Sequence, residues 1–147
     1  MAKQLFYEDI FRNLQEKNIR YLVIGGIAVN LYGVQRATAD IDLILSMSDE
    51  NLSNFIALTE ELGLRPKEKN MRAFAFEHPD DPSVVIDVMI EDLLPFEAAY
   101  ERKQIMQAGG VNVSTISLAD LIKIKQASGR EQDLADVEAL EKFGERT

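Results

Sequence analysis

Two glycines and three aspartates stand at positions where they could bind a phosphorylated ligand through metal ions. Gly25-Gly26 follows a short apolar run, Asp40-Ile41-Asp42 comes next along the chain, and Asp87 is the only charge within the apolar run 84–90. At an effective dielectric near 20, two carboxylates about 4 Å apart repel by roughly 4 kcal/mol. Either one of them is protonated or a cation lies between them. The pattern therefore predicts a functional site.

Side-chain alternation in a strand predicts that Asp40 and Asp42 share one face, while Ile41 points to the other. If the strand that carries Asp87 lies beside this one, Asp87 completes a set of oxygen ligands. Ligands of this kind suit Mg²⁺ or Mn²⁺. We therefore expect Asp40, Asp42 and Asp87 to be metal ligands. The alternatives are the solvated face of an edge strand for the first two, and a structural partner such as Arg72 for Asp87.

The glycine pair is expected between a strand over residues 20–24 and a helix over residues 27–32. Glycines at such a turn let the backbone approach a phosphate closely, and the free amides at the helix start point towards it. A plain tight turn is the alternative, because strand-Gly-Gly-helix turns are common. The aspartates that follow make phosphate binding the better interpretation.

The elements that must position these residues are predicted from hydrophobic periodicity and from turn and capping residues. They form an α+β fold, a short mixed sheet flanked by helices. In the last helix, Leu134, Val137, Ala139 and Leu140 are expected in the core, as are the aromatic residues Tyr32, Phe74 and Phe76. The expected strands are 20–24, 40–45, 72–76, 84–90 and 111–116, and the expected helices are 4–17, 27–32, 49–62, 93–104, 117–128 and 132–143.

Composition limits the classes of protein that the chain can represent. Its 147 residues predict a single domain over residues 1–147, and 46% apolar residues are enough for an ordinary core. A net charge of −9 argues against an extended nucleic-acid footprint. No cysteine, signal-peptide pattern or apolar run long enough to span a bilayer is present in the sequence. We expect a cytoplasmic protein with no membrane partner.

The same residues resemble the signature of the DNA polymerase β-like nucleotidyltransferase superfamily, in which a Gly-Gly or Gly-Ser pair precedes an acid-hydrophobic-acid motif and a third acid on a later strand. The stretch from Gly25 to Gly33, with Arg36 and Thr38 before the acidic motif, looks like the small bacterial branch that includes toxins of abortive-infection and toxin–antitoxin pairs. Better-known members of the superfamily carry serine where this chain has Gly26, and the small branch also uses Gly-Gly. The resemblance extends more loosely to residues 121–140.

The resemblance implies a nucleotidyltransferase domain that moves a nucleoside monophosphate from a nucleoside triphosphate, with ATP as the default donor, to a hydroxyl of a protein, an RNA end or a small molecule. Asp40 and Asp42 would bridge two Mg²⁺ (or Mn²⁺) ions and Asp87 would bind the catalytic one. Gly25 and Gly26 would cradle the triphosphate. Further nucleotide contacts are implied for Arg36, Thr38 and Lys125. An antitoxin-like partner protein is also implied.

Two other functions are open at this point: a non-catalytic nucleotide- or partner-binding domain of the same fold, and a small-molecule modifier of the aminoglycoside-adenylylating kind. For the charged residues near the C-terminus, an ordinary set of solvated helix charges is the favoured interpretation, with Lys125 as the main exception. These charges are Lys123, Lys125, Arg130, Asp133 and Asp136.

Overall fold

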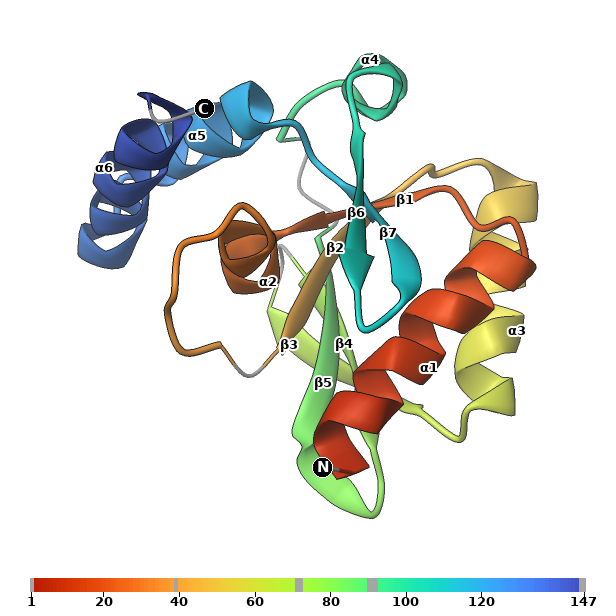
Figure 1. Cartoon of the computed structure of the whole chain (residues 1–147). Helices are drawn as coiled ribbons and strands as arrows, with labels where there is room; N and C mark the ends of the chain where they lie inside the picture. The colour runs from red at the N-terminus through yellow and green to blue at the C-terminus, as the bar shows by residue number, and fades with distance from the viewer. Residues whose placement is uncertain (1, 39, 71–72, 90–92, 146–147) are drawn as a thin grey trace.

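A computed structural model describes residues 2–38, 40–70, 73–89 and 93–145. Helices and strands alternate irregularly along the chain, as expected for an α+β fold (Figure 1). None of the described helices is long and apolar enough to cross a membrane. In chain order the elements are α1 (Ala2–Glu16), β1 (Tyr21–Ile24), α2 (Gly25–Leu31), β2 (Ile41–Leu45), α3 (Asp49–Glu61), β3 (Arg65–Asn70), β4 (Ala73–His78), β5 (Asp81–Met89), α4 (Phe96–Glu101), β6 (Gln104–Ala108), β7 (Val111–Thr115), α5 (Leu118–Ser128) and α6 (Glu131–Glu145).

The strands form one seven-stranded mixed sheet in the order β3-β4-β5-β2-β1-β7-β6. Strand β2 is central: it runs antiparallel to β1 and parallel to β5. The β3–β4 hairpin and β5 extend one half of the sheet, and the β6–β7 hairpin extends the other from β1. The predicted mixed sheet flanked by helices is confirmed.

Helices cover both faces of this sheet (Figure 1). Helices α1 and α3 lie together on one side, where Phe11 stacks on Tyr21 and Phe55 meets Phe76 edge-on, with centroids 5.4 Å apart in the second pair. Helix α2 and the α5–α6 pair lie on the other side. The buried face of β2 therefore supplies core residues, and its opposite face is available for polar groups near α2.

Serine side chains cap two of the helices: Ser48 Oγ accepts a hydrogen bond from Asn51 N at 3.2 Å, and Ser117 Oγ accepts one from Asp120 N at 3.2 Å. At the other end of α5, Gly129 adopts a left-handed conformation with φ 67°. These two helix starts fix where the chain leaves β2 and β7.

Two expectations about the core are wrong. Leu134 is 51% exposed, because the buried face of α6 carries Val137 and Leu140 and Leu134 lies off that stripe. Phe74 is 47% exposed, although it lies on the same face of β4 as the buried Phe76. Two strands also escaped prediction: β3, whose sequence Arg-Pro-Lys-Glu-Lys-Asn is polar, and β6, which was expected to be helical at its start.

Asn51, in the first turn of α3, connects the ends of the two central strands. Its side chain accepts a hydrogen bond from Arg20 N at 2.8 Å and donates to Arg20 O at 3.0 Å and to Ser46 O at 2.9 Å. Arg20 precedes β1 and Ser46 follows β2, so one buried amide ties the antiparallel pair together at the end remote from Asp42.

We predict that Asn51→Ala lowers the free energy of unfolding by about 2–3 kcal/mol, since it leaves buried backbone groups without their partners. Urea denaturation followed by circular dichroism measures this loss. Asn54→Ala, at an exposed position of the same helix, is the matched control and is expected to change stability by less than about 0.5 kcal/mol. Equal effects of the two variants would contradict the assigned role of Asn51.

Candidate functional site

Asp42 and Asp87 lie side by side on the two parallel strands at the centre of the sheet. They are register partners, as are Ile41 with Ile86 and Leu43 with Val88. Partners in a ladder point to the same face, so the two carboxylates share the face opposite Ile41 and Leu43. Asp87 is buried and Asp42 is half-buried. The expectation that the strand of Asp87 lies beside that of Asp42 is therefore confirmed.

Gly25 lies directly against the Asp42 carboxylate. Its φ is +69°, and a Cβ atom built on it would lie 2.1 Å from Asp42 Oδ2. Any other residue here would be strained by its backbone conformation and would displace the carboxylate. This contact follows from the strand register. Ile24 pairs with Asp42 across β1 and β2, which brings the start of α2 to this carboxylate.

Asp40 lies just before β2 and is close to the N-terminal helix. Burial first, and then the charges of Asp40 and Asp81, raise the pKa of Tyr7 to about 12. Tyr7 belongs to α1, so its phenol is protonated at neutral pH at the end of the sheet where Asp40 and Asp81 lie. The alternation that predicted Asp40 and Asp42 on one face applies within a strand, and β2 itself begins at Ile41.

The donor set at this site fits a hard divalent cation, because Asp42 and Asp87 offer carboxylate oxygens from register partners on the same face of the sheet. Across residues 2–38, 40–70, 73–89 and 93–145, no group of three or more His, Cys, Asp or Glu side chains is close enough to hold a metal ion by itself. The structure thus pairs two of the three predicted ligands. The metal roles of Asp40, Asp42 and Asp87 stay predictions, and the alternative partner Arg72 lies outside the described residues.

Gly26 has a different neighbour from Gly25. A Cβ atom on Gly26 would lie 2.5 Å from Thr38 Oγ1 and 3.5 Å from Arg36 Cζ. The loop between α2 and β2 therefore folds back over the start of α2 and presents a hydroxyl and a guanidinium to the glycine pair. The structure brings four predicted nucleotide-binding residues together here: Gly25, Gly26, Arg36 and Thr38.

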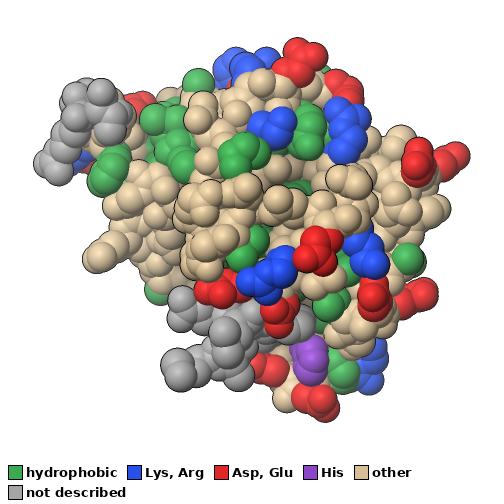
Figure 2. Space-filling view, turned by 45° about the vertical axis from the view of Figure 1, so that its right-hand side comes forward, with side chains coloured by type: hydrophobic (Ala, Val, Ile, Leu, Met, Phe, Trp, Pro, Cys, Tyr) green, Lys and Arg blue, Asp and Glu red, His purple; other side chains and the backbone are tan. Residues whose placement is uncertain are grey.

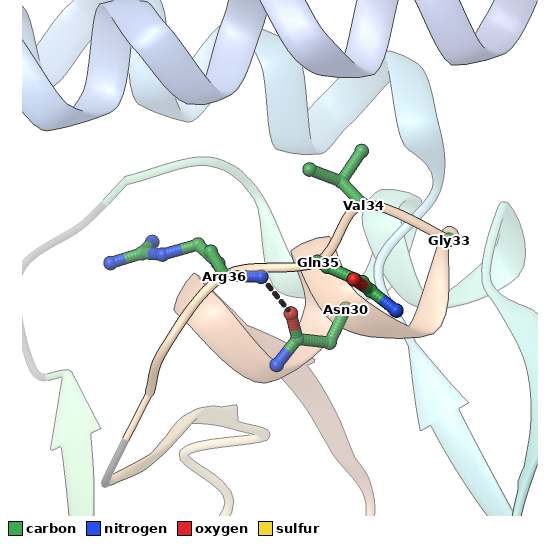
Figure 3. Close-up of a pocket in the computed structure, with 5 residues that line it drawn as sticks. All are labelled: Asn30, Gly33, Val34, Gln35 and Arg36. Carbon is green, nitrogen blue, oxygen red and sulfur yellow. Dashed lines mark hydrogen bonds between the residues drawn. The ribbon is translucent and has the colours of Figure 1, made fainter.

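The backbone of Arg36 is fixed by α2, since Arg36 N donates to Asn30 Oδ1 at 3.1 Å. Figure 3 shows this bond in an open pocket of about 390 Å³, which is lined by Asn30, Gly33, Val34, Gln35 and Arg36. The Arg36 side chain extends away from Asn30 and Gln35 in this view.

The Arg36 guanidinium reaches a buried cluster of charges between α5 and α6. Its Nη1 lies 2.7 Å from Asp136 Oδ2, and Lys125 Nζ lies 2.9 Å from the same oxygen. Lys125 Nζ is also 3.4 Å from Asp133 Oδ1, and Arg130 Nε is 2.9 Å from Asp133 Oδ2. We call Arg36, Lys125, Arg130, Asp133 and Asp136 the ion cluster.

The interpretation of these helix charges as solvated is wrong for Asp133 and Asp136, whose exposed fractions are 5% and 3%. Lys125, the expected exception, is 6% exposed. The interpretation holds for Lys123 and Arg130, which are exposed. One signal in the sequence marks the exceptions: Asp133 and Asp136 fall on the same helical stripe as Val137 and Leu140, and Lys125 lies one turn after the buried Leu121. Charges at core positions require partners.

Asp133 is ionised throughout the ordinary pH range. Burial alone would raise the pKa of Asp133, but hydrogen bonds from Ser128 and Arg130 and the charges of Lys125 and Arg130 outweigh it and lower this pKa below its usual value. The Asp133 carboxylate therefore keeps its negative charge at neutral pH.

Figure 2 shows one face of the molecule, on which basic side chains lie among acidic ones. The described part of this face carries no continuous basic area, in keeping with the net charge of −9. This distribution does not favour binding along an extended nucleic-acid backbone.

The sequence model of a protein family described as "Nucleotidyltransferase of unknown function (DUF6036)" matches residues 5–144. No curated protein matches the chain in a direct sequence comparison. Solved structures with a similar fold include the lincosamide antibiotic adenylyltransferase LnuA with lincomycin bound, at TM-score 0.69 and 18% identity over 97% of this chain and 98% of that one. Another is the antibiotic-resistance factor ANT(2'')-Ia, at TM-score 0.69 and 18% identity over 95% and 82%. A putative nucleotidyltransferase from Thermotoga maritima has TM-score 0.60 and 16% identity over 95% and 90%.

We predict that Gly25→Ala costs about 2 kcal/mol more free energy of unfolding than Gly63→Ala, the extra amount coming from overpacking against Asp42. Both glycines have a positive φ, +69° and +73°, but a Cβ atom on Gly63 meets nothing within 4 Å. The control variant Gly63→Ala therefore has the backbone strain of a positive φ without a clash such as the one between residue 25 and Asp42. Chemical denaturation of the two variants measures the difference, and equal losses would contradict the close approach of Gly25 to Asp42.

A second prediction concerns pH. Because the pKa of Asp133 is lowered in the folded state, its contribution is complete above the unfolded value of about 4 and is lost as pH falls through the folded value. We expect the free energy of unfolding of the wild type to exceed that of Asp133→Asn by about 3 kcal/mol near pH 7, since the change breaks a buried ion pair. This difference is expected to shrink below pH 4.

Denaturation curves at several pH values test this expectation. Asp9→Asn is the control, because Asp9 forms an exposed pair with Arg12 at 3.0 Å, and such pairs contribute little. A difference for Asp133→Asn that stays constant down to pH 3 would contradict the prediction.

Proposed function

Because the chain belongs to this nucleotidyltransferase family, we propose that it transfers a nucleoside monophosphate from a nucleoside triphosphate to a hydroxyl group. One observation carries the proposal: Asp42 and Asp87 are register partners on parallel strands, with Gly25 against the Asp42 carboxylate. Two carboxylates held together next to a backbone with a positive φ, at the start of a helix, suit a metal-bound triphosphate.

Each residue of the site has a proposed task. Asp42 and Asp87, with Asp40 at the start of β2, would hold Mg²⁺ or Mn²⁺, which supplies charge for the phosphates and lowers the pKa of the acceptor hydroxyl. Gly25 and Gly26 let the phosphates approach the backbone. Arg36 and Thr38 contact them from the loop after α2.

The reaction exchanges one phosphorus–oxygen bond for another. The acceptor hydroxyl oxygen bonds to the α-phosphorus, the bond from that phosphorus to the bridging oxygen breaks, and the electron pair leaves with pyrophosphate. The hydroxyl proton passes to solvent. Arg36, beside Gly26, is placed to stabilise the negative charge that grows on the leaving pyrophosphate. The predicted contact of Lys125 with this group would require its ammonium to move away from Asp133 and Asp136.

A small-molecule hydroxyl is the acceptor that we favour. This chain overlays 97% of its length on 98% of the lincosamide antibiotic adenylyltransferase LnuA. That likeness in fold to a protein that modifies a small molecule supports the choice. The fold alone is shared at 18% identity, so the particular small molecule is left open. ATP is kept as the default donor from the resemblance, although no described feature of the site selects a base.

A protein or RNA acceptor and an antitoxin-like partner belong to the toxin-like branch of the superfamily. The mixed charges of the face in Figure 2 favour neither. The protein or RNA acceptor and the antitoxin-like partner remain predictions from the resemblance. A non-catalytic nucleotide-binding domain is the remaining alternative.

We predict that Asp42→Asn and Asp87→Asn each reduce transfer by at least about a hundredfold, since each removes a metal-binding charge. The assay incubates the protein with Mg²⁺, α-labelled nucleoside triphosphates and hydroxyl acceptors that include aminoglycosides, lincosamides, cell protein and RNA. Removal of the cation with EDTA is expected to abolish transfer as well.

Glu60→Gln, at an exposed position of α3, is the control for the loss of one carboxylate and is expected to retain full activity. Label that appears on a macromolecule and not on a small molecule would overturn our choice of acceptor. Nucleotide binding that depends on Mg²⁺, with no transfer to any acceptor class, would favour the non-catalytic alternative.

A further inference from the structure

The ion cluster links the α5–α6 pair to the loop that crosses the glycine pair. Arg36 comes from the loop after α2, whereas its partner Asp136 comes from α6, 100 positions later in the chain. Their contact is short, 2.7 Å, and the Asp136 side chain is almost fully buried. An ion pair of this kind restricts the guanidinium much more than an exposed one would.

Arg36 is held at two points. Asn30 Oδ1 accepts a hydrogen bond from its backbone N–H, and Asp136 Oδ2 binds its guanidinium. Between these two anchors the guanidinium carbon lies 3.5 Å from the Cβ position of Gly26. The arginine is therefore fixed over the glycine pair before any ligand arrives.

Asp136 is in turn fixed by the helices that carry it. Lys125 Nζ contacts the same Oδ2 at 2.9 Å, and Gln132 Nε2 donates to Oδ1 at 3.0 Å. Both carboxylate oxygens are thus engaged, so rotation of the carboxylate would break several bonds. A buried carboxylate with this many donors keeps its position.

The balance of charge favours an anion beside Arg36. Three cations, Arg36, Lys125 and Arg130, are connected by the described ion pairs to two carboxylates, Asp133 and Asp136. The cluster therefore carries one positive charge in excess. Lys125 lies between Asp133 and Asp136, and Arg130 pairs with Asp133. Arg36 is the cation of the cluster whose guanidinium lies beside the Gly26 position.

We propose that Asp136 is a positioning residue, which acts through Arg36 to set the affinity of the site for the triphosphate group of the nucleotide. Lys125 serves as the counter-ion that permits Asp136 to be buried. This inference rests on the proposed function, because it assigns the glycine pair to the phosphates. The α5–α6 pair, which lies apart from the paired carboxylates, is then a working part of the nucleotide site.

The first test measures Arg36 itself and needs no ligand. In ¹⁵N-labelled protein, the Nε–H signal of Arg36 is identified by its loss in Arg36→Lys, and its heteronuclear NOE reports motion on the picosecond to nanosecond scale. We expect a rigid signal in wild type and in Asp133→Ala, and a mobile one in Asp136→Ala. An Arg36 signal that is equally rigid in Asp136→Ala would overturn the proposal.

The second test is the dissociation constant for a non-hydrolysable ATP analogue with Mg²⁺, measured by calorimetry. Asp136→Ala should weaken binding about tenfold, the scale for loss of an outer-shell partner. Asp133→Ala removes the carboxylate of the cluster that does not contact Arg36, and it should change binding less than twofold. In the Arg36→Ala background, Asp136→Ala should cause no further loss of affinity for the analogue.

The outcomes separate the two hypotheses. No binding of the analogue by wild type would overturn the proposed function, while the Arg36 signal would still report whether Asp136 orders the arginine. Binding that is unchanged or tighter in Asp136→Ala, or weakened equally in both alanine variants, would overturn the role of Asp136. If Asp136→Ala fails to fold by circular dichroism, Asp136→Asn replaces it, with a smaller expected effect in the same direction.

Discussion

The parallel pairing of β2 with β5 is the interaction on which the rest of the structure depends. It places Asp42 beside Asp87 in the middle of a sheet whose other face is apolar. Like charges at this spacing oppose folding unless a cation or proton compensates. The surrounding strands hold the pair in place: the ladder continues on one side to β1 and on the other to β4, so neither carboxylate can leave without disturbing several neighbours. The site is built into the centre of the sheet.

The second half of the site is constructed in a different way. Around Gly26, a loop supplies Arg36 and Thr38, and side chains determine their position. Loops are mobile unless tertiary contacts restrain them. Here a hydrogen bond from α2 and an ion pair from α6 supply the restraint. The backbone of the sheet thus positions the two carboxylates, and side-chain contacts position the loop beside Gly26.

Much of the site could be predicted from the sequence because it depends on local patterns. Asp42 stands within an alternating strand, Asp87 interrupts an apolar run, and Gly25 and Gly26 separate a strand from a helix. The register of Asp42 with Asp87 follows only once β5 is known to pair with β2, although β3 and β4 intervene in the chain. Long-range pairing of this kind is not encoded in any short window.

The contacts of the ion cluster could not be predicted, because they depend on packing and not on a local pattern. Its residues near the C-terminus are charges at spacings that also occur on solvated helix faces. Only the packing of α6 against α5 shows that Asp133 and Asp136 point inwards, and that Leu134 points outwards. The polar strand β3 illustrates the same limit, because its place at the sheet edge comes from its partner β4 and not from its own composition.

The separation of Arg36 and Asp136 by 100 positions has a consequence for synthesis of the protein. Both carboxylates of the β2–β5 pair have been translated by residue 87, whereas the anchor of Arg36 is added close to the C-terminal end. Contacts so distant in sequence form late, because a long loop must close first. A nascent chain can therefore acquire its central sheet while the phosphate side is still incomplete. In the proposed mechanism, Arg36 would reach its anchored position only after α6 has been synthesised and has docked.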